Sequence, residues 1–250
     1  MTAISDHSHD KSPQSDRIAW AKTAILLGMG VYFFLLILTG KITYYINMRF
    51  AWLVVVGAAI FIVLALVNMY SNLKEADEDC HEHYQIGWDI LLIVALPLLL
   101  ALLIPSRSLG IEAVNGGISL NPVGVAGPSA FQRSPLDRNI LDWLREFDRA
   151  SSPAAFNGTA ADVIGFVYRE PSFADDSFMI SRFTMSCCVA DAFPIGMPVS
   201  GPGASDFATG AWARVQGELK AADFGGDIMP VLFADTIEAV DEPQQPYLYP

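Results

Sequence analysis

The segment Ser186–Asp191, Ser-Cys-Cys-Val-Ala-Asp, holds the residue types of this 250-residue chain that are best suited to chemistry. Thiolates and carboxylates bind zinc and softer transition-metal ions. On a regular strand Cys187 shares the inward face with Met185, whereas Cys188 shares the polar face and lies close to Asp191 in sequence. We therefore predict a core thiol at Cys187, and a transition-metal site such as a zinc site formed by Cys187, Cys188 and Asp191.

Two other interpretations of the cysteine pair stay open. The thiols could be buried and structural, or they could exchange with disulfides of a partner, because unpaired thiols outside the cytoplasm meet an oxidising environment. A disulfide between Cys187 and Cys188 is disfavoured because the ring that it closes is strained. No histidine follows His83, so the C-terminal part has no imidazole base for a cysteine nucleophile, and we predict that the protein is not an enzyme.

A second set of metal-binding residue types lies in the polar segment 74–83, where Cys80, His81 and His83 stand among several carboxylates. Thiolate and imidazole are preferred zinc ligands, and neighbouring acids raise the local concentration of cations. The spacing does not complete a four-ligand shell. The segment is thus a candidate metal site or, alternatively, a solvated acidic loop between two apolar stretches.

Three apolar stretches, at about residues 23–45, 50–73 and 88–106, dominate the first half of the chain. A helix needs roughly 20 apolar residues to cross the bilayer core of about 30 Å, so each stretch is close to a spanning length. The first lacks a small-x-small cleavage pattern after it and is predicted to be a retained anchor. Residues 23–106 are therefore expected to lie in the lipid bilayer, preceded by a disordered tail over residues 1–22.

The distribution of Lys and Arg predicts the orientation in the cell inner (plasma) membrane. One side carries four basic residues and the other carries three; they are Lys11, Arg17, Lys22 and Lys74 against Lys41, Arg49 and Arg107. The side richer in basic residues is usually cytoplasmic, which favours a multi-pass protein with its N-terminus inside and its C-terminal domain outside. A cytoplasmic C-terminal domain is the alternative.

The remaining sequence predicts a soluble all-β domain joined to the membrane α-helices. Residues 107–133 form a Gly/Pro-rich linker, and residues 134–150 form an amphipathic helix with Ser134 as its cap. Residues 160–242 contain four or five strand-like segments, including one that runs from Phe178 to Val189, and residues 243–250 form a tail. Strands without a strong helix between the first three favour a small OB-like barrel.

The charge of the C-terminal part excludes one class of partner. From residue 161 to residue 250 there are 13 Asp and Glu against 4 Lys and Arg, a net charge of -9. Proteins grip nucleic acid by neutralising its phosphates with Lys and Arg. A nucleic-acid partner is therefore not expected.

Several segments together resemble a bacterial two-gene permease small-subunit family of unknown function. They are residues 39–47, Pro-Ser-Arg-Ser-Leu-Gly at 105–110, Gly-Phe-Val-Tyr-Arg-Glu at 165–170, Arg-Phe-Thr-Met-Ser-Cys-Cys-Val-Ala-Asp-Ala at 182–192 and the terminal Pro-Tyr-Leu-Tyr. The resemblance implies an exterior C-terminal domain and a polytopic permease-like partner. In several relatives the loop after the second span is longer and rich in His, whereas here it is reduced to residues 80–83. The resulting hypothesis is a membrane accessory subunit whose exterior domain binds a ligand such as a metal ion, with a thiol-redox protein or a structural tether as alternatives.

Overall fold

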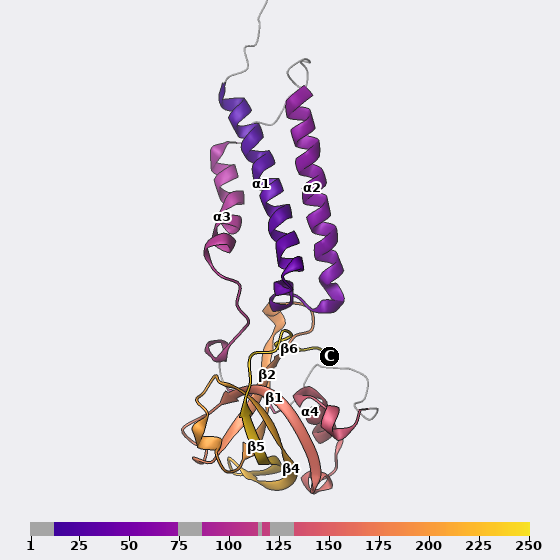
Figure 1. Cartoon of the computed structure of the whole chain (residues 1–250), viewed down its shortest axis with the longest axis vertical. Coiled ribbons are helices and arrows are strands. Elements are labelled where there is room, and N and C mark those ends of the chain that lie inside the picture. The colour runs from indigo at the N-terminus through magenta and orange to yellow at the C-terminus, as the bar shows by residue number, and fades with distance from the viewer. Residues whose placement is uncertain (1–12, 75–86, 115–116, 121–132) are drawn as a thin grey trace, which may run out of the picture. The chain divides into compact units, whose positions relative to one another are not determined.

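The computed structural model describes residues 13–74, 87–114, 117–120 and 133–250 of the chain. These residues divide into two compact units, one made of Met1–Ile42 and Met48–Ser106, the other of Thr43–Asn47 and Arg107–Pro250. The first unit is helical and the second is built on a β-barrel (Figure 1). The five residues Thr43–Asn47 leave the helical unit and belong to the β unit, although helices precede and follow them in the sequence.

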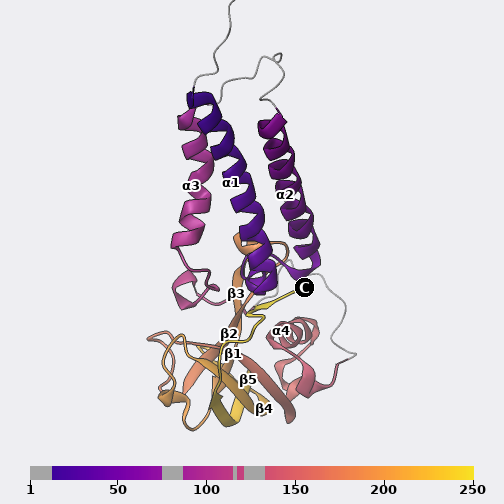
Figure 2. The same cartoon turned by 45° about the horizontal axis from the view of Figure 1, so that its top comes forward.

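The helical unit consists of α1 (Pro13–Leu38), α2 (Ala51–Lys74) and α3 (Trp88–Leu103), with α1 beside both other helices (Figure 2). The helix α1 begins inside the segment predicted to be a disordered tail, and that expectation is wrong from residue 13 onward. Proline is tolerated at a helix start because the missing N–H would have no intrahelical partner there. Close packing uses glycine, since a Cβ on Gly30 would lie 2.7 Å from the Ile62 side chain.

The length and surface of α1 and α2 suit a bilayer. Arg17–Leu38 and Met48–Lys74 are long and apolar enough to cross one, whereas the apolar helix Trp88–Leu103 is shorter. Only 17% of the apolar stretch of α1 and 11% of that of α2 are buried within the protein. The core helix of a soluble protein would bury most of such a stretch, so lipid is the solvent that these two helices fit.

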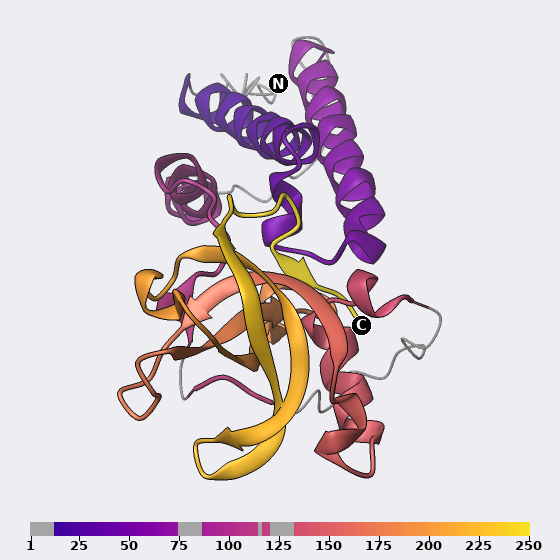
Figure 3. The same cartoon turned by 60° about the horizontal axis from the view of Figure 1, so that its bottom comes forward.

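A closed barrel of five strands forms the centre of the β unit (Figure 3). The strands are β1 (Thr159–Tyr168), β2 (Ser177–Thr184), β3 (Phe193–Ser200), β4 (Trp212–Phe224) and β5 (Asp227–Ala239). They follow the order β1-β2-β3-β5-β4 and close through the antiparallel pair β1 and β4. Among these five strands, the pair of β3 and β5 is parallel and the other pairs are antiparallel. The predicted small barrel is present and fits an OB-like architecture.

The pairing of β4 with β5 contains a bulge: Gln216 and Gly217 face Thr236 and Ala234, so Asp235 of β5 is the extra residue. A Cβ at Gly217 would lie 2.0 Å from the carbonyl oxygen of Phe233, a distance that no side chain can occupy. Glycine is therefore required at this close approach of β4 and β5. The 13-residue strand β4 pairs with β1 on one edge and with β5 on the other.

One amphipathic helix, α4 (Ile140–Arg149), supplies apolar side chains to the barrel core. The predicted start at Ser134 is wrong because residues 135–137 form a separate 3-10 turn, and Ser134 makes no side-chain cap. The helix begins after Asn139, whose side chain accepts the N–H of Asp142, while the Asp142 carboxylate accepts the N–H of Asn139. This reciprocal cap satisfies two N–H groups that a helix end leaves unpaired.

The segment predicted to be a free C-terminal tail is also folded. Tyr247 and Leu248 form β6, which pairs in parallel with the end of β2. The guanidinium group of Arg182 donates hydrogen bonds to the carbonyl oxygens of Gln245 and Pro246, and burial lowers the pKa of Arg182 to about 10. The Tyr247 hydroxyl accepts the N–H of Leu109 at 2.7 Å, so the described start of the predicted linker is part of the same domain.

Candidate functional site

The cysteine pair lies just beyond the end of β2 and is exposed. Strand β2 ends at Thr184, Cys187 is exposed and Cys188 is half-buried. The prediction that Cys187 is a core thiol is therefore wrong, because the strand alternation on which it was based stops before Cys187. The two thiols are free, and their sulfur atoms are 3.7 Å apart.

Asp191 holds the segment that carries the two cysteines. One carboxylate oxygen accepts the N–H of Ser186 at 3.0 Å and the other accepts the N–H of Cys187 at 2.7 Å. Partial burial alone would raise the pKa of Asp191, but the bonds from the Cys187 thiol and from the backbone outweigh it and lower the pKa. The carboxylate is thus charged at neutral pH and bends the chain away from the path of β2.

The same carboxylate controls the protonation of the nearest thiol. The hydrogen bond from the Cys187 thiol to Asp191, with a further contribution from the Cys188 thiol, raises the pKa of Cys187 to about 11. A negative charge nearby disfavours a thiolate, and a thiol that donates a hydrogen bond is stabilised in its protonated form. Cys187 is therefore a protonated and weakly nucleophilic thiol at neutral pH.

Residues 45–47, between α1 and α2, form an isolated antiparallel bridge with the cysteine segment. The N–H of Asn47 donates to the carbonyl oxygen of Cys187 at 3.0 Å, and the N–H of Val189 donates to the carbonyl oxygen of Tyr45 at 2.9 Å. Ile46 and Cys188 face each other as an antiparallel pair. The cysteines are therefore positioned by residues that are about 140 positions away in sequence.

The side chain of Asn47 strengthens this pairing. It is buried, and its amide nitrogen donates to the carbonyl oxygen of Ser186 at 2.8 Å and to that of Met185 at 3.4 Å. Thr43 adds a bond from its hydroxyl to the carbonyl oxygen of Gln244 at 3.5 Å. We call residues 43–47 the docking strand; in this segment the end of a 3-10 helix (Lys41–Tyr44) leads into a single bridge residue, Ile46. The carbonyl groups of the cysteine segment thus find their donors in the docking strand.

The sequence analysis does not predict the docking strand, because it assigns residues 43–45 to the end of the first membrane span. The available signal was its composition. Residues 42–46, Ile-Thr-Tyr-Tyr-Ile, are β-branched and aromatic, which is typical of a strand and unusual for a membrane loop. A segment this short cannot form a hairpin of its own, so its strand propensity required a partner elsewhere in the chain.

The predicted metal ligands fall into two groups with different outcomes. Cys187, Cys188 and Asp191 lie together in one short segment, but among the described residues no group of three or more His, Cys, Asp and Glu is arranged to hold a metal ion. Cys80, His81 and His83 lie outside the described residues. The predicted set of ligands is thus not supported as a complete metal site.

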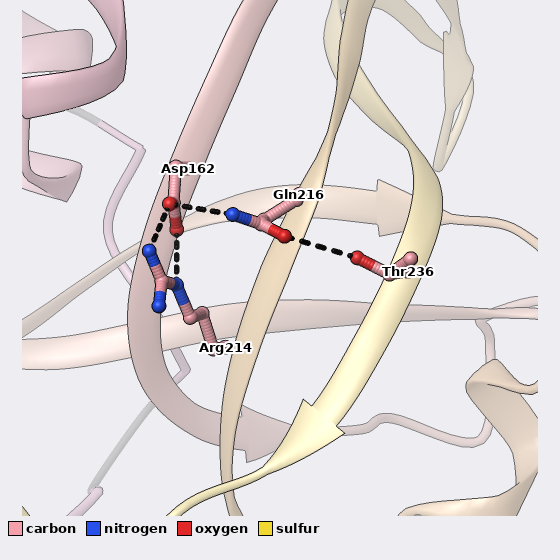
Figure 4. A network of polar contacts seen from close by, with 4 residues as sticks. All are labelled: Asp162, Arg214, Gln216 and Thr236. Carbon is pink, nitrogen blue, oxygen red and sulfur yellow. Dashed lines mark hydrogen bonds and ion pairs between the residues drawn. The ribbon is translucent and has the colours of Figure 1, made fainter.

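A separate polar network crosses the outer face of strands β1, β4 and β5 (Figure 4). The guanidinium group of Arg214 donates two hydrogen bonds to Asp162, Gln216 donates to the same carboxylate at 2.8 Å, and Thr236 donates to Gln216 at 3.3 Å. The bonds from Arg214 lower the pKa of Asp162. Both carboxylate oxygens already accept protein donors, so this network stabilises the barrel and offers no free group for chemistry.

Comparison with known proteins covers most of the chain. Residues 21–117 match the family model described as the DUF1980 N-terminal domain, and residues 136–250 match the DUF1980 C-terminal domain. A Streptococcus mutans protein named "Putative two-component membrane permease complex subunit" is 21% identical over 262 residues, which cover 88% of this chain and 94% of the relative. UPF0703 protein YcgQ of Bacillus subtilis is 21% identical over 278 residues, covering 90% of this chain and 97% of the relative.

The Asp162 network predicts a stability effect that depends on pH. We expect Asp162→Asn to lower the free energy of unfolding at pH 7 by about 1 to 2 kcal/mol. The loss is modest because water reaches half-exposed Arg214 and screens part of its attraction to Asp162. Because the pKa of Asp162 is lowered in the folded state, the stabilisation is complete above about pH 4 and is lost as the pH falls through that lowered pKa.

Denaturant unfolding of the full chain in detergent at pH 7 and pH 3 measures this difference. Thr236→Ala, at the exposed end of the same network, is the matched control and should change stability by less than about 0.5 kcal/mol. An equal effect of Asp162→Asn at both pH values would contradict the assigned role of the carboxylate.

Proposed function

Because the chain belongs to the DUF1980 family and contains both of its domains, we propose that it is a non-enzymatic accessory subunit of a two-component membrane permease complex. The name of the Streptococcus mutans relative supports this proposal. The helices α1 and α2 would lie in the inner membrane and the barrel would lie outside the cytoplasm. The observation that carries the proposal is the pairing of the docking strand with the cysteine segment.

The pairing constrains how many times the chain crosses the membrane. Backbone hydrogen bonds join residues 45–47 to residues 187–189, so both must lie on the same side of the bilayer. If α2 crosses after the docking strand, the segment that follows Lys74 is on the opposite side. The chain must then cross once more before Arg107 to return to the barrel, which makes α3 the third span.

The short length of α3 is compatible with that role. Its 16 residues rise about 24 Å, which is somewhat less than the hydrocarbon thickness of about 30 Å. A bilayer thins around a short span at a modest cost in free energy. Pro97 inside the helix is tolerated in membrane helices, where neighbouring groups compensate the missing hydrogen bond.

The partner would be a polytopic permease-like membrane protein. Many large apolar side chains on α2 and α3 are exposed in this chain, with examples including Trp52, Val63, Leu92, Ile93 and Leu103. A helix of the partner can replace lipid on such a surface through close packing. On this account the barrel is fixed beside the partner by the docking strand and by the chain that follows α3.

The thiol-redox alternative receives less support from the geometry. Disulfide exchange requires a thiolate, and the pKa of Cys187 is raised to about 11 beside Asp191. The structural-tether alternative is compatible with the docking strand, and it differs from the accessory subunit only in whether the partner transports a solute. A solute-transport assay on the isolated complex distinguishes these two possibilities.

The topology proposal can be tested with the native cysteines. Labelling of intact cells with a membrane-impermeant maleimide should modify the Cys187 and Cys188 pair in a Cys80→Ser variant, slowly because the raised pKa of Cys187 leaves little thiolate. It should leave Cys80 unmodified in a Cys187→Ser/Cys188→Ser variant. Lysed cells serve as the control, because both variants should react there. Labelling of Cys80 and of the cysteine pair from the same side would contradict a membrane crossing by α3 between them.

The subunit proposal predicts a stable complex. Purification of the tagged full chain from native membranes in mild detergent should recover a polytopic membrane protein in a fixed ratio. Asn47→Ala, which weakens the docking strand, should reduce that recovery, while the surface variant Thr236→Ala should not. Recovery of the chain alone under conditions that keep it folded would reject the accessory-subunit role.

A further inference from the structure

We propose that Cys187 and Cys188 form a dithiol site that chelates one thiophilic d10 cation of the Cu⁺ or Zn²⁺ class, with the docking strand and Asp191 as positioning elements. The inference deepens the proposed function by naming a ligand class for the exterior domain, and it rests on that function for its biological use. The chemistry itself concerns residues of this chain alone and can be tested without the partner.

The separation of the two sulfur atoms suits a shared cation better than a disulfide. Two sulfurs bound to one Zn²⁺ ion at about 2.3 Å with tetrahedral angles lie about 3.8 Å apart. The observed separation is 3.7 Å, so Zn²⁺ can enter with little movement of either side chain, whereas Cu⁺, which two thiolates bind in a near-linear arrangement, requires the exposed Cys187 side chain to turn outward. A disulfide needs the sulfurs at about 2.05 Å, which requires a large approach within one dipeptide.

The backbone around the cysteines resists that approach. On one side the carbonyl oxygen of Cys187 is held by Asn47 and the N–H of Val189 by Tyr45. On the other side Asp191 holds the N–H of Cys187. Closing a vicinal disulfide would distort the peptide between the cysteines and break these bonds, whereas binding a cation between the thiols leaves them in place. The docking strand therefore keeps the pair in its dithiol form.

The number and type of ligands select the class of cation. Two thiolates are soft ligands, and soft ligands favour Cu⁺ and, among borderline ions, Zn²⁺. Two sulfurs do not complete the four-ligand shell of a structural zinc site, so positions on a bound ion stay available to water or to another donor. Cys187 is exposed, which gives the ion a route from solution. Such a site can accept and release a cation rather than store it permanently.

Asp191 is better assigned as a positioning residue than as a ligand. Both of its oxygens accept backbone N–H groups of the cysteine segment, at 3.0 and 2.7 Å. Turning a lone pair of the carboxylate toward an ion would weaken the bonds that shape the loop. The binding of a cation replaces the protons of the two thiols, one from each, so the site releases protons as it fills.

Titration of the full chain in detergent with Cu⁺, against a chromophoric Cu⁺ chelator under reducing and anaerobic conditions, tests the site. The background carries Cys80→Ser, His81→Ala and His83→Ala, so that these residues contribute no ligand. We expect one equivalent of Cu⁺ and an ultraviolet sulfur-to-copper charge-transfer band. Zn²⁺ should bind at the same residues more weakly, since its shell is incomplete.

Matched variants separate ligands from positioning residues. Cys187→Ser and Cys188→Ser should each remove the charge-transfer band and weaken binding at least tenfold. Asn47→Ala should retain the band but weaken binding severalfold, whereas Thr236→Ala should bind as the background does. Full binding without either thiol would overturn the assignment, and so would an absence of binding by the folded background. Rapid oxidation of the pair to a vicinal disulfide by a small-molecule disulfide would overturn the role given to the docking strand.

Failure of the cation site can be distinguished from failure of the proposed subunit role. A chain that binds no Cu⁺ or Zn²⁺ but still co-purifies with a polytopic protein would reject the cation site and leave the subunit role intact. A chain that binds one cation per molecule but co-purifies with no partner would support the cation site and reject the subunit role.

Discussion

The pairing of Tyr45 and Asn47 with the cysteine segment is the interaction on which the rest of the architecture depends. It joins a segment flanked by two apolar helices to the end of a barrel strand by backbone hydrogen bonds at 2.9 and 3.0 Å. Backbone N–H and C=O groups must find partners wherever water is excluded, so the two segments satisfy each other. This requirement makes a segment between two apolar helices part of the β unit.

The strength of the pairing comes from the polar groups that would be left unpaired without it. A typical hydrogen bond contributes about 1 kcal/mol, but a buried group that loses its partner costs about 1 to 3 kcal/mol. Buried Asn47 serves two carbonyl groups with one side chain in addition to its backbone bond. Removal of the docking strand would therefore disturb the cysteine segment before it disturbed the barrel core.

The cysteine segment derives its chemical character from the same arrangement. The docking strand fixes its carbonyl groups and Asp191 fixes its N–H groups, while the exposed Cys187 thiol and the half-buried Cys188 thiol lie 3.7 Å apart. A negative charge beside Cys187 disfavours the free thiolate. The hydrogen bonds that hold the backbone oppose a disulfide within the pair, and the proposed cation would have to displace the protons of both thiols.

Features with local sequence signals could be predicted, and those that depend on distant contacts could not. The helix α2 is predictable from the length of its apolar stretch, and the barrel is predictable from β-branched and aromatic runs such as Val163–Tyr168. Both are patterns of neighbouring residues. The burial of Cys187 was predicted incorrectly because the end of β2 is imposed by Asp191 and by Asn47, and no strand propensity encodes such contacts. The sequence likewise predicts a tail at Tyr247, because its partners, in β2 and at Leu109, are distant in sequence.

Disulfide trapping between the docking strand and the cysteine segment tests this account most directly. Ile46 and Cys188 form a non-hydrogen-bonded antiparallel pair, for which a Cα separation of about 4.5 Å permits a disulfide. In native membranes, Ile46→Cys in a Cys80→Ser/Cys187→Ser background should cross-link to Cys188 within the same chain under mild oxidation. Tyr45→Cys, whose side chain leaves the opposite face of the strand, should not. Equal cross-linking of both variants, or none of either, would contradict the docking strand.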